Sequence, residues 1–527
     1  MAKAAVNKLN PEPKPVAEKA ADLGFPLRVA CVDIGSNAIR ALVAEFDSTV
    51  NYRLVMEERY RVRLGHGVFL HGKLDERAVE AAVDAMKSVR AAIDRLSPVK
   101  YRAVATSAVR EASNGRMFMD RVRNEAGIDL EIITGSEEAR LVHLAVKKRI
   151  SLINRQWILV DLGGGSVEVS LVDDSGILWS ESHIMGSVRL LEELSISAEE
   201  PGRFQKLLED YISTLKIPSV ARYNKPAGMI GTGGNIEELA RLAGCRPDHD
   251  GVSAMSPSDL RAMIGTLSRM PFKQRVESLG LKEDRADVIL PAGMVYDRIA
   301  GLIETKIILV PHVGVKEGIL YDLVEELTTH DAREQRQEDQ TLSGAVNLGR
   351  RYFFDEQHSV HVARLAVSLF DQLRDIHGLG ENEKKYLLAA GVLHDVGTYI
   401  SYKKHHKHSL YVISNSELPG FSEHEMLITA NIARYHRKSE PKTVHELYQA
   451  LTRAEQEAVI KLAALLRVAD ALDREHTQNV HNVSALIDRQ YLALELHGVG
   501  EMRLERWALR KKDQLFIRAF GLKVKVR

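Results

Sequence analysis

The sequence predicts a duplicated α/β domain with a central cleft between its two copies. An all-helical domain and a small α+β subdomain are expected to follow. A repeated order of elements indicates the duplication. A short apolar strand, an Asp-x-Gly turn, a second strand and a hairpin turn begin at Leu27, and the same series begins again at Trp157. From about residue 342 to 483 the apolar residues recur with helical spacing instead.

The first copy is expected over residues 27–150, after a flexible tail at 1–26 that lacks the apolar segment of a signal peptide. Its longest helix should begin after Asp75, whose carboxylate can accept hydrogen bonds from the first free N–H groups. The expected elements are, in order, strands at 27–32, 41–46 and 52–64, a helix to about 96, a strand at 101–106, a helix, a strand at 130–134, and a helix from 135 to about 149.

The second copy is expected over residues 151–314, with a helix at 315–327 that returns to complete the first copy. It contains a further Gly-rich turn between a strand and a helix, at Met229–Asn235. Its expected strands include 157–160, 167–172, 177–182 and 306–311.

The polar, highly charged stretch 328–340 is predicted to be a linker. Residues 341–485 should form the helical domain. Residues 486–527 should form the small final subdomain, with short strands at 491–497 and 514–526.

Composition excludes several classes of protein. Lysine plus arginine equals aspartate plus glutamate at 72 each, so no overall field attracts nucleic acid polymers or membranes. No apolar run is long enough to cross a bilayer. The only two cysteines, Cys31 and Cys245, argue against a disulfide framework and fit the reducing cytoplasm.

The most informative stretch is the turn from Asp161 to Glu168, which holds three consecutive glycines after a buried strand. Successive N–H groups in such a turn form a concavity that binds anions. A carboxylate before the turn and another after it suit Mg²⁺ bound to phosphate. The alternative is an ordinary Gly-rich β-turn, which the two flanking acids make less attractive.

An ordered set of motifs along the chain resembles the exopolyphosphatase and guanosine pentaphosphate phosphohydrolase (Ppx/GppA) family. The motifs are Asp33–Asn37, Thr106–Arg110, Gly135–Arg140, Asp161–Glu168, Gly231–Gly234, Gly314–Gly318, His394–Gly397, His405–Ser409 and Arg434–Lys438. This resemblance implies the fold of actin, hexokinase and the heat-shock ATPases, which is RNase H-like. Ala38 and Val167 stand where the family often has serine and threonine, which could alter a hydroxyl contact to phosphate or metal.

The resemblance implies that Glu138 is the general base that aligns the attacking water. Burial in a closed cleft would raise the basicity of this carboxylate. The alternative for Glu137 and Glu138 is a charged first helical turn, which the helix dipole favours, and one of the pair is expected to play only that part.

The resemblance also implies a Mg²⁺ site, with Mn²⁺ as a substitute, held by Asp161 and Glu168 with Asp33 close by. Arg110 would face the phosphate, because its planar guanidinium matches phosphate geometry; a solvated arginine at a helix start is the alternative. The phosphate-binding residues expected are Gly35, Ser36, Asn37, Arg110, Gly163, Gly164, Gly165, Ser166, Gly233 and Gly234.

The helical half carries His358, His394, Asp395 and Asp470, in an order that resembles the HD metal-dependent phosphohydrolases. Histidine and carboxylate ligands suit Zn, Fe or Mn. These residues therefore form a candidate second metal site, and a buried polar network or a basic rim is the competing interpretation.

Cationic residues in the same half form a candidate patch for a polyanion that extends out of the cleft; a solvated charged face is the alternative. The patch consists of Lys403, Lys404, Lys407, His408, Arg434, Arg437 and Lys438.

The resulting hypothesis is a cytoplasmic, Mg²⁺-dependent exopolyphosphatase that releases terminal orthophosphate from inorganic polyphosphate. Hydrolysis of guanosine pentaphosphate at the same cleft is the alternative within enzymes. A sugar kinase would need a carbohydrate pocket with an Asp base, and an assembly ATPase would need a β-sandwich or filament surface where this chain has helices. By resemblance, the chain is expected to form a homodimer.

Overall fold

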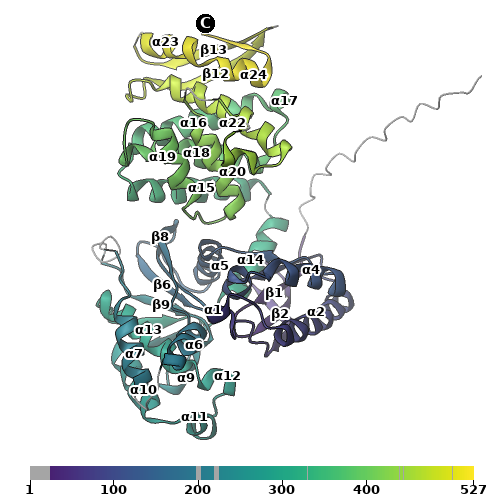
Figure 1. Cartoon of the computed structure of the whole chain (residues 1–527), viewed down its shortest axis with the longest axis vertical. Coiled ribbons are helices and arrows are strands. Elements are labelled where there is room, and N and C mark those ends of the chain that lie inside the picture. The colour runs from purple at the N-terminus through teal and green to yellow at the C-terminus, as the bar shows by residue number, and fades with distance from the viewer. Residues whose placement is uncertain are drawn as a thin grey trace, which may run out of the picture.

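A computed structural model describes residues 24–197, 203–218, 225–328, 330–437, 440–442, 444–488, 490–500 and 502–526. The tail expected at 1–26 lies almost wholly outside the described residues. Figure 1 shows two α/β domains side by side, a helical domain stacked above them, and a small sheet at the end that carries the C-terminus.

The first sheet has the strand order β3-β2-β1-β4-β5, with β1 (Leu27–Ile34) at its centre. β1 pairs antiparallel with β2 and parallel with β4. Seven of its eight residues are buried, because helices cover both faces of the sheet. The other elements are β2 (Ile39–Phe46), β3 (Tyr52–Tyr60), α1 (Val68–His71), α2 (Glu76–Leu96), β4 (Lys100–Ala105), α3 (Ser107–Glu111), α4 (Gly115–Ala126), β5 (Glu131–Ile132) and α5 (Gly135–Lys147).

Alternation along β1 assigns its residues to two separate cores. Ala30, Val32 and Ile34 pack with α2 and α4, whereas Val29 and Cys31 pack with α5 and α14 (Val315–Thr328). The expected cap is present, since the Asp75 carboxylate accepts from the N–H groups of Arg77 and Ala78. β5 is shorter than the strand expected at 130–134, because Thr134 instead caps α5.

The second sheet has the order β10-β11-β9-β6-β7-β8. Its run β9-β6-β7-β8 repeats the run β4-β1-β2-β3 with the same strand directions, which confirms the duplicated α/β fold. The elements are β6 (Trp157–Leu162), β7 (Val167–Asp173), β8 (Gly176–His183), α6 (Ser187–Ser197), α7 (Arg203–Ser213), β9 (Met229–Thr232), α9 (Gly234–Leu242), β10 (Ser253–Met255), α10 (Pro257–Arg269), α11 (Phe272–Leu279), α12 (Glu283–Ala286), α13 (Ile289–Leu302) and β11 (Ile308–Val310).

A shared core joins the two copies. Helix α14 follows the second copy but packs on β1 of the first, as expected for residues 315–327. It lies so close to α5 that a Cβ at Gly318 would stand 2.1 Å from the Leu141 carbonyl oxygen. The position of α5, whose first turn carries Glu138, is therefore fixed by both halves of the α/β pair.

The stretch 328–340, expected as a linker before the helical domain, is largely helical. Helix α15 runs from His330 to Arg351, and its later turns face β8 and α18. Its charged composition suits a helix that connects two domains, because such a helix has few apolar positions.

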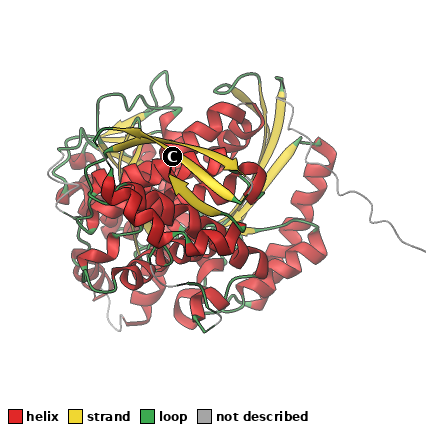
Figure 2. Ribbon diagram, turned by 90° about the horizontal axis from the view of Figure 1, so that it is seen from above, coloured by secondary structure: helices red, strands yellow, loops and turns green. Residues whose placement is uncertain are grey.

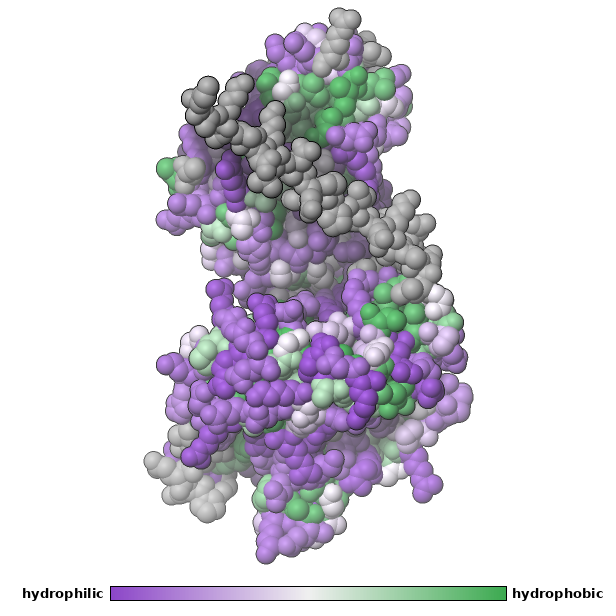
Figure 3. All heavy atoms as spheres, turned by 90° about the vertical axis from the view of Figure 1, so that its right-hand side faces the viewer, coloured by the Kyte–Doolittle hydropathy of each residue, from purple (hydrophilic) through white to green (hydrophobic). Residues whose placement is uncertain are grey.

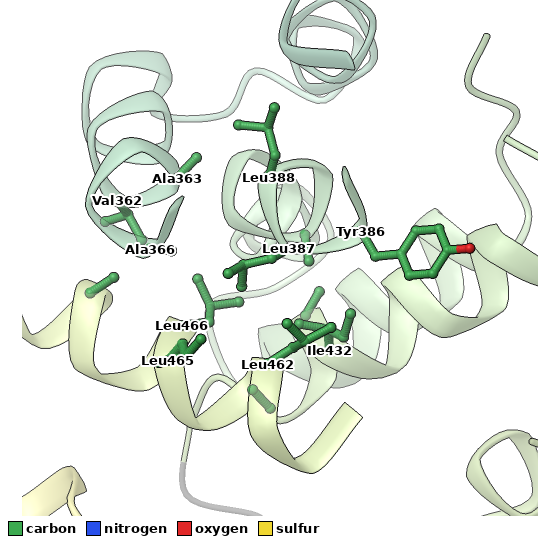
Figure 4. Close-up of a cluster of buried hydrophobic side chains, with 14 of the residues drawn as sticks. Val362, Ala363, Ala366, Tyr386, Leu387, Leu388, Ile432, Leu462, Leu465 and Leu466 are labelled. Atoms are coloured by element: carbon green, nitrogen blue, oxygen red, sulfur yellow. The ribbon is translucent and has the colours of Figure 1, made fainter. Parts of the chain in front are cut away.

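The rest of the helical domain packs around one apolar core. Side chains from α16, α18, α20 and α22 meet there, among them Val362, Leu387, Ile432 and Leu466 (Figure 4). Its elements are α16 (Glu356–Gln372), α17 (Arg374–His377), α18 (Glu381–Leu393), the 3-10 turn η1 (Val396–Tyr399), α19 (His405–Ser414), α20 (Glu423–Arg434), α21 (Glu446–Gln449) and α22 (Arg453–Leu472).

The final subdomain is a three-stranded sheet, β12-β13-β14, with two helices. Its strands lie across the helices in the view down the long axis (Figure 2). β12 begins at Val480, so the boundary predicted at 485/486 falls inside a strand. The strand expected at 514–526 is a helix followed by a short strand. The elements are β12 (Val480–Asp488), β13 (Tyr491–Gly498), α23 (Arg503–Lys512), α24 (Gln514–Phe520) and β14 (Lys523–Val526).

The surface of this subdomain is partly apolar. Figure 3 shows hydrophobic surface at the end of the molecule where it lies. Large apolar side chains that are about half exposed here include Leu486, Ile487, Val499, Leu504 and Trp507. None of the helices in the described residues is long and apolar enough to cross a membrane.

Candidate active site

The Asp-x-Gly turns of the two copies lie against each other. Each turn is closed by the same bond, from Gly35 N–H to the Ala38 carbonyl at 3.1 Å and from Gly163 N–H to the Ser166 carbonyl at 3.0 Å. A Cβ added at Gly164 would stand 2.8 Å from the Ser36 Cβ, so only glycine allows this approach.

These turns and a third one line a cavity of about 1100 Å³ between the copies. The third turn has Gly233 at φ +95°, a conformation that favours glycine, and Gly234 begins α9. Free N–H groups at a helix start favour an anion. The residues that line the cavity as predicted are Asp33, Gly35, Ser36, Asn37, Glu138, Asp161, Gly163, Gly164, Gly233 and Gly234.

Four predicted site residues are not among the described residues that line this cavity: Arg110, Gly165, Ser166 and Glu168. The Arg110 guanidinium donates to the Ile133 carbonyl at 2.6 Å and stands 3.9 Å from the Glu138 carboxylate. Arg110 is thus placed to act on the carboxylate, and its expected role facing the phosphate stays a prediction.

Three buried carboxylates, those of Glu138, Asp161 and Glu168, meet behind the turns. One oxygen of each lies within 4.8 Å of the others. Ser166 and Ser182 donate to one oxygen of Glu168, at 2.7 and 2.9 Å, and Thr232 donates to Asp161 at 2.6 Å. The Oε2 atoms of Glu138 and Glu168 are buried and have no hydrogen-bond partner within the described parts of the chain.

Crowding and burial disfavour the charged forms of all three acids. Burial raises the pKa of Asp161 to about 6 and, with help from the Asp161 charge, that of Glu168 to about 7. Burial and the Glu168 charge raise the pKa of Glu138 well above its usual range. Two unpaired oxygens among converging carboxylates are the donor set that a divalent cation prefers, so these residues fit Mg²⁺.

Asp33 stands apart from this cluster. It lies on β1 at the cavity wall, and its carboxylate accepts from Arg40 at 3.1 Å. The structure therefore groups Glu138, and not Asp33, with Asp161 and Glu168. The metal role was assigned from one turn and its repeat, so the sequence did not show that Glu138, from α5, enters the same space.

The two glutamates at the start of α5 have different surroundings. Glu137 pairs with Arg140 at 2.6 Å and with Arg102 at 3.1 Å, in a network that includes Asp322. Glu138 points to the acid cluster. Glu137 is thus the member of the pair that serves only as a charged residue of the first helical turn.

Cationic side chains that were not among the predicted site residues also line the cavity: Arg40, Arg59, Lys282, Arg285 and Lys316. Arg40 follows the first Asp-x-Gly turn on β2, and Lys316 lies in the Gly314–Gly318 motif at the start of α14. No local pattern marks the other three, because β3 and the start of α12 bring them in from distant parts of the chain. Arg285 reaches the third turn, where it donates to Asn235 at 2.7 Å.

The four residues of the candidate second metal site do come together in the helical domain. Asp470 Oδ1 lies 3.9 Å from the Nε2 atoms of both His358 and His394, and Asp395 Oδ1 lies 3.9 Å from His394 Nε2. All but Asp395 are buried.

The candidate polyanion patch lies beside this group. Lys403, Lys404 and Lys407 are exposed, and the Arg437 guanidinium lies 3.2 Å from His405 Nδ1. Lys438 lies outside the described residues. Whether the patch binds a polyanion stays a prediction.

The helical domain also touches the start of α5. The Ser136 N–H donates to the Glu417 carboxylate at 3.2 Å, and the Ser136 hydroxyl donates to the Leu418 carbonyl at 3.3 Å. Asn347 and Arg351 of α15 donate to carbonyls of β8.

Comparisons with known proteins agree with this arrangement. A model of the Ppx/GppA phosphatase family matches residues 42–327, and a model of domain III of the same phosphatases matches residues 342–513. The chain is 26% identical over 416 residues to a Vibrio vulnificus protein named guanosine-5'-triphosphate,3'-diphosphate pyrophosphatase; the match covers 78% of this chain and 80% of that one. A Pseudoalteromonas translucida protein of the same name is 24% identical, with 77% and 80% covered.

The crystal structure of an exopolyphosphatase from Cytophaga hutchinsonii is also similar. Its TM-score is 0.53 at 26% identity, and the match covers 57% of this chain and 98% of that one.

Paired actin-like domains, a cleft lined by phosphate-type turns and a buried acid cluster define a phosphoanhydride hydrolase. Since the two family models together match most of its length, the chain belongs to the Ppx/GppA phosphatase family.

Proposed function

We propose that the protein is a Mg²⁺-dependent exopolyphosphatase that releases orthophosphate from the end of inorganic polyphosphate. The observation that carries the proposal is the cavity itself: N–H donors of three turns and several cationic side chains surround it, and buried carboxylates meet at its wall. Inorganic polyphosphate is a chain of negative charges with no other group to recognise. A lining of N–H donors and cationic side chains is therefore sufficient to bind it.

The chain's own residues can perform the hydrolysis. The turns at Gly35–Asn37 and Gly163–Gly164 would hold the terminal phosphates from opposite sides. Glu138 would orient a water and take its proton as the water oxygen attacks the terminal phosphorus. The P–O bond to the rest of the chain breaks, and the shortened chain leaves with the bridging oxygen. Arg110 would help to keep the Glu138 carboxylate ionised. Asp161 and Glu168 would hold Mg²⁺, or Mn²⁺ in its place, which neutralises phosphate charge.

Guanosine pentaphosphate is the second candidate substrate. It ends in the same phosphoanhydride, and the two relatives described above are named as pyrophosphatases of this nucleotide, guanosine-5'-triphosphate,3'-diphosphate. A direct comparison of phosphate release from polyphosphate and from guanosine pentaphosphate, each with and without Mg²⁺, would separate the two activities.

The base assignment has a matched pair of variants. Glu138→Gln should lower kcat by ~10²–10⁴-fold, because it removes the proton acceptor and keeps the shape. Glu137→Gln should keep kcat near the wild-type value and lower stability, because Glu137 is held by Arg102 and Arg140. If Glu137→Gln were the inactive member and Glu138→Gln remained active, the base would be misassigned.

We also propose that the protein works in the cytoplasm as a homodimer. Support for the dimer comes from the partly exposed apolar residues of the final subdomain, such as Ile487 and Trp507. Sedimentation of the wild type and of Trp507→Lys would test this, since a dimer formed through this surface should dissociate in the variant.

A further inference from the structure

Six polar residues converge at one end of the helical core, far from any Gly-rich turn in the sequence. Two of them extend the apolar stripes of their helices by one turn: His358 lies four residues before Val362 in α16, and Asp470 four after Leu466 in α22. His436 lies just past the end of α20, four residues after Ile432. Figure 4 shows Val362, Ile432 and Leu466 packed in the core. His394 and Asp395 follow α18, and His405 begins α19. The same packing that builds the core therefore aims these side chains at one point.

The histidines present the same nitrogen to this point. Nδ1 of His358 lies 2.8 Å from the Asp473 carboxylate, Nδ1 of His394 lies 2.6 Å from the Gly391 carbonyl, and Nδ1 of His436 lies 2.6 Å from the Ala433 carbonyl. Since each neighbour is an acceptor, each Nδ1 carries the proton, and each Nε2 has a free lone pair. This is the arrangement by which proteins orient imidazole ligands.

Two of these lone pairs have no protein partner among the described residues. Nε2 of His358 and Nε2 of His394 belong to fully buried rings and make no hydrogen bond there. Nε2 of His405 and Nε2 of His436 lie 3.3 Å apart, and the Arg437 guanidinium stands 3.4 Å from the first. Buried acceptors without donors are costly, and a network of hydrogen bonds alone leaves the Nε2 atoms of His358 and His394 unsatisfied.

Asp395 divides the group into two ligand sets. Its Oδ1 lies 3.1 Å from His405 Nε2 and 3.4 Å from His436 Nε2, and on the other side 3.9 Å from His394 Nε2. Ligand atoms around one ion at bonds of about 2.1 Å lie about 3.0–3.5 Å apart. The distances between these atoms therefore need to shorten only slightly for the residues to bind two ions that share this carboxylate.

We propose that the helical domain holds a dinuclear site for divalent transition metals, bridged by Asp395. One ion would be bound by His358, His394 and Asp470, and the second by His405 and His436. Imidazole and carboxylate ligands in these proportions suit ions such as Mn²⁺ or Fe²⁺ more than Mg²⁺. The site is separate from the carboxylate cluster of the cleft and does not depend on its function.

The surroundings agree with a bound cation and an open side. The second oxygen of Asp470 is held by Lys512 of α23, which leaves Oδ1 directed at the two histidines. Asp395 is the most exposed of the six, with 21% of its side chain accessible, so the site opens at the bridging residue. Arg437 lies against His405, which neighbours Asp395, and would attract an anion to the metals.

The experiment is metal binding to the full-length chain. Protein stripped with a chelator is dialysed to equilibrium against Mn²⁺ in the presence of a large excess of Mg²⁺, which occupies the carboxylate site of the cleft, and bound manganese per chain is counted. We expect two Mn²⁺ per chain and an exchange-coupled EPR signal. Asp395→Asn should lose both ions, and His405→Gln and His436→Gln should each lose one. His424→Gln is the matched control, because His424 is exposed and pairs only with Glu455 among the described residues; it should keep both ions.

Three results would overturn the proposal. Wild-type protein that binds no Mn²⁺ under these conditions refutes it without any variant. One ion that is unchanged in His405→Gln and His436→Gln refutes the second ligand set. Loss of manganese in His424→Gln equal to that in Asp395→Asn would show that binding is not at this site. Circular dichroism of each variant establishes that the helices are intact.

Discussion

Glu168→Gln tests the acid cluster through stability, independently of catalysis. In the metal-free protein, burial raises the pKa of Glu168 from 4.5 to about 7, so ionising it in the folded state costs free energy. The folded pKa is the higher one. Stability is therefore complete below the unfolded pKa and falls as the pH rises toward and through 7.

The size of the effect follows from this shift. Raising the pKa of one carboxyl from 4.5 to about 7 corresponds to about 3 kcal/mol in the free energy of unfolding. Nearly all of this stability is lost by pH 8, and less than about 1 kcal/mol is lost at pH 5. Glutamine removes the charge but retains the oxygen that accepts from Ser166 and Ser182. Metal-free Glu168→Gln should therefore exceed the wild type by about 3 kcal/mol at pH 8 and nearly equal it at pH 5.

Thermal unfolding with chelator or with Mg²⁺, at pH 5 and pH 8, measures both halves of the prediction. At roughly 2 °C per kcal/mol for a unit of this size, the variant should melt about 6 °C higher at pH 8 without metal. Mg²⁺ should stabilise the wild type and leave the variant nearly unchanged, because a ligand stabilises only the state that binds it. Glu181→Gln, at an exposed position on β8, should show neither effect. Equal behaviour of Glu168→Gln and wild type at pH 8, or an undiminished Mg²⁺ shift, would refute the reasoning.

Two further predictions concern the cleft and the patch. Gly164→Ala should reduce phosphate release by at least ~10-fold without unfolding the protein, because its Cβ would stand 2.8 Å from Ser36 and push the two turns apart; wild-type kinetics would contradict the close approach. Reversing the charge of Lys403, Lys404 and Lys407 together should weaken retention of long polyphosphate, and more so at low salt, so that intermediate lengths accumulate on a gel while cleavage of short chains is unchanged. If the product ladders of variant and wild type look alike, the patch is only a solvated face.

Local patterns predicted the α/β pair well. Short local sequence patterns determine the order of strands and turns, and the hairpin geometry follows from glycines and alternating burial. Charge patterns were less informative. The stretch 328–340 is as polar as a linker, yet it is largely α-helix, and residues 514–520 form a helix although their apolar run suited a strand.

The contacts within the site could be predicted from the sequence only where the residues belong to one motif. Gly163 and Asp161 lie in one turn, so their neighbourhood was evident from the sequence. The meeting of Glu138 with Glu168 was not, because it depends on how α5 packs between the two copies. Arg285 and Ser182 were missed for the same reason, since no local pattern distinguishes them from surface residues.

The contact between α5 and the helical domain bears on how the two halves should be studied. Glu417 accepts from the Ser136 N–H at the start of α5, where the helix dipole favours an anion, and Ser136 lies two residues before Glu138. A chain cut after α14 would retain every turn and carboxylate of the cleft, but it would lose this anchor. Slower cleavage by the shortened chain could then arise from a displaced base as well as from a lost polyanion patch. Charge reversal at Lys403, Lys404 and Lys407 avoids the ambiguity, because it leaves Glu417 and α5 in place. Retention of long chains should therefore be assigned to the patch from full-length variants alone.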